Sequence, residues 1–381
     1  MTSRSLFCTI ASAAIVTTGL ATVITPATAV SGTLLYDCTS EDLGSHVVSA
    51  VIDTDAPATL LAGQSVPVTV TTTVTIPESM ADVVRLAGVT AVDGTAVADG
   101  YVNGAIRQAN LTIPKTVVPS ADDAPIVVTG SGPTAPLGAA IPVVLDLTAG
   151  GFTATFNLYN ASDTIFDTAT MVCTVQPSQI VLVDSVTVNG VPTTTTITVA
   201  SPLEYGAAPD VTADVAVTGS NAKPAGTVEF TFEGKSVKVG VKGGKAKATL
   251  AAALTMGSRT VSAKFTPTDA SLAPSEASRA VTVVRAQTTT TATAVYRDAR
   301  NRLVGKALVE AHHGTDVAGD VKFVLRRNGV KIRTAIVELN QFDKAKKVFK
   351  RIRKPGTYRL IARYLGSETL KRSVDRVKLN V

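Results

Sequence analysis

The 381-residue sequence predicts an all-β protein made of three consecutive β-sandwich-type domains. Three observations lead to this prediction. Apolar and polar residues alternate in short runs bounded by Gly or Pro, as in strands that turn one face to a core and the other to water. A unit of about 100 residues occurs twice in the second half, far longer than the repeat of a solenoid. An isolated pair of cysteines frames most of the first half.

Residues 1–29 have the features of a secretory signal peptide. Arg4 precedes an apolar run over residues 6–24, which ends in Pro-Ala-Thr-Ala, an Ala-x-Ala site with cleavage before Val30. The alternative is an uncleaved membrane anchor, but threonine and glycine dilute the run below a good span of about 20 residues. We therefore expect a secreted, extracellular protein.

Cys38 and Cys173 remain after cleavage, because Cys8 leaves with the signal peptide. Outside the cytoplasm, an isolated pair of this kind predicts one disulfide bond. A free thiol or a metal-binding pair is the alternative, although no histidine stands at ligand spacing. The disulfide would link the two ends of an N-terminal β-domain at residues 30–178. Three runs in it show the strand pattern: 66–76, 141–147 and 152–158.

The second half of the chain contains one module twice. The segment Pro-Ala-Gly-Thr-Val-Glu-Phe at 224–230 returns as Val-Ala-Gly-Asp-Val-Lys-Phe at 317–323. The strand pattern that follows Gly257 returns after Gly356. A short insertion separates the two copies, which are therefore tandem domains rather than stacked repeats.

Further motifs carry a family resemblance. The threonine run at 193–196, Tyr205-Gly206 and Gly243-Gly244-Lys245-Ala246 join the two repeated segments. With them, residues 180–284 resemble a bacterial immunoglobulin-like repeat of secreted and surface proteins. Members of this family mostly serve as spacers or adhesive modules, and the motif marks a fold rather than a site.

The second copy keeps the threonine run at 288–291 and both strand motifs, but has Val317 in place of the usual proline. The resemblance implies immunoglobulin-like domains at 179–285 and 286–381, the second basic and divergent.

The N-terminal domain has a looser resemblance. Tyr36-x-Cys38, Ala56-Pro57, Gly63 and the late Cys173 are similar to an uncharacterised secreted β-domain that precedes immunoglobulin-like repeats in actinobacteria. This resemblance implies no known activity.

Charge is distributed unevenly along the chain. Residues 30–179 hold 14 acidic and 3 basic side chains, a net charge of −11, and residues 180–284 are nearly balanced at +1. Residues 285–381 hold 8 acidic and 23 basic side chains, a net charge of +15. A basic end of this kind suggests an anionic partner.

The basic residues of the last module occupy outward strand positions, such as Lys322 and Arg359, and a dense run between those strands. That run supplies the candidate polyanion-binding residues Lys344, Lys346, Lys347, Lys350, Arg351, Arg353 and Lys354. The alternative is a face that is only solvated, with basic edges that prevent aggregation. Charge of one sign, rather than interspersed charge, is the argument for a polyanion surface, and both interpretations stay open. Candidate partners are phosphate-bearing wall polymers, acidic lipids and released nucleic acid, the last without sequence-specific reading because aromatic residues are few.

No catalytic motif is present, so we predict no catalytic residue, no cofactor, no metal site and no enzyme activity. His312 and His313 follow an apolar strand and are expected at a surface turn, without a cysteine or carboxylate at metal-binding spacing. The alternative is an extracellular hydrolase whose site lies in the N-terminal domain. A deep pocket with paired carboxylates or a Ser-His pair would identify it.

The sequence thus predicts a secreted, non-catalytic binding or structural protein of the bacterial cell surface. Its basic C-terminal module would contact anionic envelope polymers. No transmembrane segment is expected in the mature chain and no wall-sorting tail follows the last predicted strand. The protein is therefore expected to be either released or held at the wall by noncovalent contacts. The ligand and the oligomeric state stay open.

Overall fold

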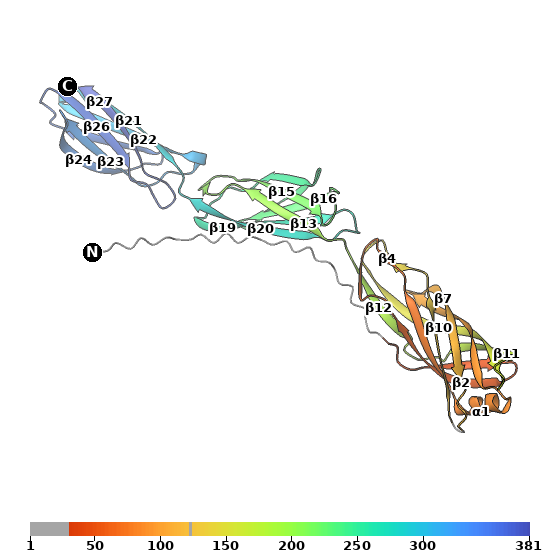
Figure 1. Cartoon of the computed structure of the whole chain (residues 1–381). Helices are drawn as coiled ribbons and strands as arrows, with labels where there is room; N and C mark the ends of the chain where they lie inside the picture. The colour runs from red at the N-terminus through yellow and green to blue at the C-terminus, as the bar shows by residue number, and fades with distance from the viewer. Residues whose placement is uncertain (1–29, 122–123) are drawn as a thin grey trace, which may run out of the picture. The chain divides into compact units, whose positions relative to one another are not determined.

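The computed structural model describes residues 30–121 and 124–381, and the predicted signal peptide lies outside them. Strands and loops make up nearly all of the described chain, which confirms the all-β class (Figure 1). The chain divides into two compact units, with the boundary between Asn189 and Gly190. None of the helices among the described residues is long and apolar enough to cross a membrane.

The first unit is built from strands and one helix. Its elements are β1 (Leu34–Ser40), β2 (Gly44–Thr54), β3 (Thr59–Leu61), β4 (Ser65–Val66), β5 (Thr69–Ile76), α1 (Glu78–Leu86), β6 (Ala91–Val102), β7 (Ala105–Val117), β8 (Ile126–Pro133), β9 (Leu137–Gly138), β10 (Val143–Tyr159), β11 (Ile165–Val175) and β12 (Leu182–Asn189). Ten strands form one sheet in the order β11-β1-β2-β5-β8-β7-β6-β10-β12-β3, and β4 pairs with β9 separately. Because β11 also pairs with β10, the large sheet bends around its own core and closes on itself.

Closure depends on the long strand β10. It pairs with β12 over residues 143–148 and with β11 over residues 152–159. The change of partner falls at Gly150-Gly151, where the register against β6 also shifts. A Cβ atom on Gly151 would lie 2.7 Å from the carbonyl oxygen of Cys173. Glycine is therefore needed for β11 to approach β10 at this point.

Helix α1 is an element that the sequence prediction missed. Met80, Ala81 and Val84 are buried and follow helical spacing, so the helix covers part of the core of the first unit. At nine residues it is too short to give the long apolar periodicity by which a helix is recognised in a sequence.

Strand β12 corrects the predicted domain boundary at residue 178. It pairs antiparallel with β10 and parallel with β3, so it belongs to the first unit. Asp184 on this strand is 3% exposed and accepts hydrogen bonds from the Thr54 hydroxyl at 2.9 Å and the Ser185 N–H at 2.7 Å. Alternation predicts a strand but not the sheet that it joins, which is why the boundary was placed too early.

The second unit contains two modules, each with its own core. The middle module comprises β13 (Thr193–Val199), β14 (Leu203–Glu204), β15 (Asp210–Val217), β16 (Gly226–Phe232), β17 (Lys235–Gly240), β18 (Lys245–Thr249), β19 (Gly257–Pro267) and β20 (Ser275–Val284). The last module comprises β21 (Thr288–Arg297), η1 (Asp298–Arg300), β22 (Arg302–Ala311), η2 (His312–Gly314), β23 (Asp320–Arg327), β24 (Val330–Glu338), β25 (Lys344–Lys350), β26 (Thr357–Tyr364) and β27 (Ser373–Asn380).

Each module has two sheets. In the middle module they are β13-β15-β18 and β14-β20-β19-β16-β17, and in the last module β21-β22-β25 and β24-β23-β26-β27. The repeated Phe230 and Phe323 are fully buried in the respective cores. Multiple β-domains are thus present, as the sequence predicted.

The threonine runs link the two sheets of each module. Thr193 and Thr195 on β13 are buried, and both hydroxyls contact the hydroxyl of Ser275 on β20, at 2.9 and 2.7 Å. The last module repeats this contact with Thr288, Thr290 and Ser373. The threonine run noticed in the sequence therefore forms hydrogen bonds that join the first and last strands of a module.

Tyr358 makes a second structural contact in the last module. Its ring is 2% exposed and its hydroxyl donates to the carbonyl oxygen of Lys354 at 2.7 Å. A tyrosine that bonds the backbone a few residues upstream is a feature of immunoglobulin-type sandwiches.

Replacing Tyr358 by Phe is expected to lower the free energy of unfolding of the last module by about 1 kcal/mol, since one largely buried hydrogen bond is lost. Urea unfolding followed through the amide signals of this module measures the change. Tyr101→Phe is the control, because the hydroxyl of this half-buried tyrosine makes no such bond. Unchanged stability of Tyr358→Phe would mean that the bond contributes nothing.

Candidate functional site

The basic run of the last module forms a strand. Lys344, Lys346, Lys347 and Lys350 all lie in β25, which corrects the prediction that the run lies between strands. Strand β25 is the edge of the sheet β21-β22-β25. Lysine on an edge strand protects it from pairing with another chain, so part of this charge has a structural use.

Alternation along β25 sorts its lysines by face. Lys344, Lys346 and Lys350 are exposed on the outer face, whereas Lys347 shares the inner face with Ala345 and is half-buried at the sheet edge. The prediction treated these lysines as one group, and the structure brings only the first three together on the outer face.

Register places further basic residues opposite the outer lysines. Lys306 on β22 is directly opposite Lys346, and Arg302 is directly opposite Lys350. Directly opposed side chains on one face lie about 5 Å apart at Cβ, and like charges there are destabilising. The outer face of β22 and β25 thus carries two like-charged cross-strand pairs.

The remaining residues of the predicted group follow β25. Arg351, Arg353 and Lys354 are exposed, and Ile352 between them is 3% exposed. The Tyr296 hydroxyl donates to the carbonyl oxygen of Ile352 at 2.8 Å, so this segment is held against the core while its basic side chains face solvent.

The other sheet of the module has a second basic face. Arg326 on β23, Arg359 on β26 and Lys378 on β27 stand directly opposite one another in one row. Lys322 and Arg363 form a neighbouring cross-strand pair. These positions had been predicted to point outward, and the row adds Lys378, whose place only the register reveals.

Acidic partners for these side chains are missing from the part of the chain that the structure describes. Among the described residues, no Lys or Arg of 285–381 lies within 4.0 Å of a carboxylate oxygen. The middle module differs, since Lys245 pairs with Asp214 at 2.5 Å and Lys264 with Glu276 at 3.4 Å. The last module therefore presents positive charge that its own carboxylates do not neutralise.

Aromatic side chains of the last module are mostly internal. Phe323, Phe349, Tyr358 and Tyr364 are buried, and Phe342 is 63% exposed. Base stacking needs exposed rings along a groove. This arrangement fits contact with a charged backbone better than the reading of nucleic-acid bases.

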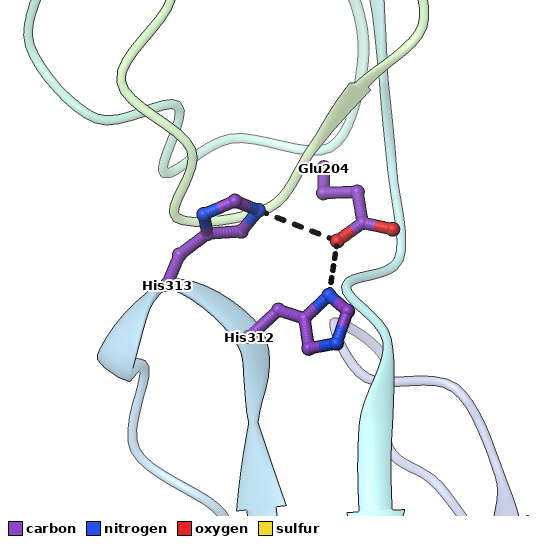
Figure 2. Close-up of side chains that lie close together, drawn as sticks. All are labelled: Glu204, His312 and His313. Atoms are coloured by element: carbon purple, nitrogen blue, oxygen red, sulfur yellow. Dashed lines mark hydrogen bonds and ion pairs between the residues drawn. The ribbon is translucent and has the colours of Figure 1, made fainter.

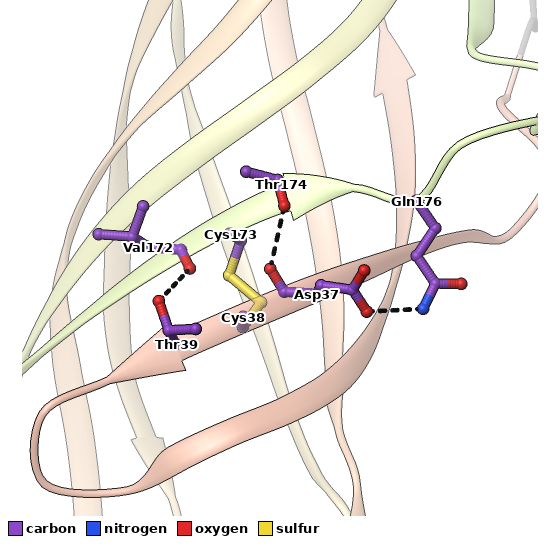
Figure 3. The surroundings of a disulfide bond; sticks show 7 residues. All are labelled: Asp37, Cys38, Thr39, Val172, Cys173, Thr174 and Gln176. Carbon is purple, nitrogen blue, oxygen red and sulfur yellow. Dashed lines mark hydrogen bonds between the residues drawn. A yellow bond between two sulfur atoms is a disulfide. The ribbon is translucent and has the colours of Figure 1, made fainter.

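The predicted disulfide between Cys38 and Cys173 is present. The two cysteines are directly opposite each other on β1 and β11, and both are buried (Figure 3). Asp37 beside the bridge accepts a hydrogen bond from the Gln176 side chain at 2.7 Å. The bridge thus links β1 to β11, the strand that also pairs with β10 where the sheet closes. A disulfide of this kind is typical of proteins outside the cytoplasm.

The first unit contains a cavity of about 80 Å³. Asp99, Tyr101 and Arg107 are its polar lining besides threonines, and the rest of the lining is apolar or glycine. Ligand pockets usually have about 300–1,000 Å³. Asp99 is the single carboxylate among the residues that line this cavity. The absence of enzyme activity stays a prediction.

The structure also assembles a cluster that the sequence could not reveal. Glu204 lies within hydrogen-bonding distance of His312 and His313, although 108 residues separate Glu204 from His312 (Figure 2). Burial opposes ionisation of Glu204, but the Gln287 N–H, the neighbouring His312 and Lys371 outweigh it, so the pKa of this carboxyl lies below its usual value. The sequence had placed the two histidines at a turn, which is where η2 holds them.

Comparisons with known proteins assign no activity. No curated protein sequence matches this chain. A crystal structure titled "Putative membrane anchored protein from Corynebacterium diphtheriae" is similar at 14% identity, covering 92% of this chain and 94% of that one, with a TM-score of 0.37. A tetra-tandem repeat from the extending region of a large adhesion protein is similar at 12% identity, covering 94% of this chain and 92% of that one, with a TM-score of 0.35. Residues 35–183 match the DUF6801 family, a family of unknown function, which agrees with the expected uncharacterised N-terminal domain.

Proposed function

We propose that the protein is a secreted, non-catalytic binding or structural protein of the bacterial cell surface. The middle module acts as a spacer, and the last module binds an anionic envelope polymer, with phosphate-bearing wall polymers as the partner that its charge fits best. Such contacts would hold the protein at the wall noncovalently.

The observation that carries this proposal is the uncompensated charge of the last module. Cross-strand rows of like charge cost stability in the free protein, and no carboxylate within 4.0 Å offsets them among the described residues. A polymer with regularly spaced negative charges would relieve this repulsion and release its own counterions. Charges of mixed sign would keep the surface soluble equally well, so solubility alone does not require a surface of one sign.

Charge reversal on one face tests the proposal. The variant carries Glu at Lys306, Lys344, Lys346 and Lys350, which lie on the outer face of β22 and β25. We expect its affinity for isolated bacterial cell walls at low salt to fall about 100-fold, since each exposed charge contributes up to about 1 kcal/mol. Co-sedimentation of the full chain with walls measures the affinity.

A matched control makes the same change of charge on the middle module. It carries Glu at the exposed residues Lys235, Lys238, Lys242 and Lys247, and should bind walls nearly as well as the original chain. Equal loss of binding in both variants would mean that the net charge of the chain, and not the position of the lysines, determines binding. Retention of both variants on walls would mean that the basic face is only solvated.

A further inference from the structure

Three potential metal ligands meet where the middle module joins the last. Glu204 ends β14, and His312 and His313 form η2 after β22 (Figure 2). The Oε2 atom of Glu204 lies 3.2 Å from Nδ1 of His312 and 3.3 Å from Nε2 of His313. The three donor atoms all lie within 4.8 Å of one another.

The backbone of η2 explains why both rings face one carboxylate. Neighbouring residues of a continuing strand would point to opposite faces. His313 instead has φ 61° and ψ 17°, in the left-handed region, and this turn brings its ring back toward Glu204. The two imidazole planes lie at 89° with centroids 6.0 Å apart, so each ring directs a nitrogen to the same oxygen without blocking the other.

Packing holds the cluster in place. Tyr205, next to Glu204, packs against the cores of both modules. Gly206 approaches so closely that a Cβ atom there would lie 2.2 Å from Cγ2 of Thr315. The backbone N–H of His312 donates to the carbonyl oxygen of Gln287 at 2.9 Å. The ligands therefore sit on ordered elements rather than on free surface side chains.

We propose that Glu204, His312 and His313 form a binding site for a first-row divalent cation, with Zn²⁺ as the best fit. Zinc bonds to His nitrogen and Glu oxygen are about 2.0–2.2 Å long, so the ligand atoms of a tetrahedral ion lie roughly 3.3–3.5 Å apart. The two separations from Oε2 are close to this value. Imidazole ligands disfavour Ca²⁺ and Mg²⁺, which take oxygen.

The site has room for a further ligand. The side chains of His312 and His313 are 54% and 39% exposed, whereas that of Glu204 is 23% exposed. Two histidines and a glutamate leave the fourth position of a tetrahedral zinc ion to water or an external group. Because Glu204 belongs to one module and the histidines to the next, a bound ion would join the two modules.

Zinc titration by calorimetry tests the site, using the full chain prepared without a polyhistidine tag. We expect one equivalent of Zn²⁺ to bind. Glu204→Gln should weaken binding at least about tenfold, since even outer contacts of a metal site change affinity by about 10–100-fold. Replacing His312 and His313 together by Ala should abolish binding, and amide spectra show whether each variant is folded.

Two more variants distinguish a specific site from nonspecific binding of Zn²⁺ to histidine side chains. Gly206→Ala keeps all three ligands but crowds Thr315, and should weaken binding. His46→Ala removes the remaining histidine of the chain, which lies on β2, and should leave binding unchanged. The proposal is overturned if the original chain binds no Zn²⁺ at tenfold excess, or if Glu204→Gln binds as tightly as the original.

Discussion

Raising the salt concentration from 50 to 200 mM should weaken binding of the full chain to isolated cell walls by about 300-fold. This value assumes that about six basic side chains each neutralise one phosphate of a flexible polymer, with a slope of roughly −0.7 per contact in a plot of log affinity against log salt. The faces defined by β22 and β25 and by β23, β26 and β27 each offer enough opposed Lys and Arg to supply such contacts. Binding isotherms at several salt concentrations give the slope.

The slope also tells which face binds. Reversal at Lys306, Lys344, Lys346 and Lys350 should make it shallower, whereas the middle-module control should leave it unchanged. A second variant with Glu at Arg326, Arg359 and Lys378 examines the other face in the same way. An affinity that does not depend on salt in the original chain would contradict counterion release and with it the proposed partner.

Replacing Cys38 and Cys173 by Ala should lower the free energy of unfolding of the first unit by about 2–5 kcal/mol. The bridge closes a loop with a sequence separation of 135 residues, so its loss frees a large part of the unfolded chain. Because the bridge holds β11, the strand whose pairing with β10 closes the sheet, the whole unit should be affected. Urea unfolding of the variant and the original chain measures the difference.

Reduction of the original chain provides the control for this result, and it should destabilise the first unit by a similar amount. The second unit contains no cysteine, so its unfolding should be the same in all samples. Alkylation of both cysteines after the unreduced chain has been unfolded in urea would show that the bridge does not form in solution.

Local patterns were sufficient for much of the fold. Period-two alternation in runs such as 228–232 and 261–265 predicted strands, because a strand between core and water must alternate. The repeated segments around Phe230 and Phe323 predicted two modules with equivalent cores. The pairing of Cys38 with Cys173 could be predicted because the mature extracellular chain has no other cysteine with which either could form a disulfide.

Features that depend on strand register and on closure of the sheet could not be predicted from local sequence patterns. The assignment of β12 to the first unit rests on its ladder with β10. The like-charged pair of Lys306 and Lys346 exists only because β22 and β25 pair in one register, and a shift by one residue would turn those lysines to the other face. Helix α1 was too short to be recognised from its periodicity.

The sequence by itself determined the all-β class, the repeated modules, the disulfide and the sign of charge in each part of the chain, since composition and local alternation carry that information. The tertiary structure decided which side chains meet. Glu204 reaches His312 and His313 through the packing of a short strand, a glycine and a left-handed turn. Contacts of this kind depend on residues far apart in the chain, and no local pattern encodes their distance.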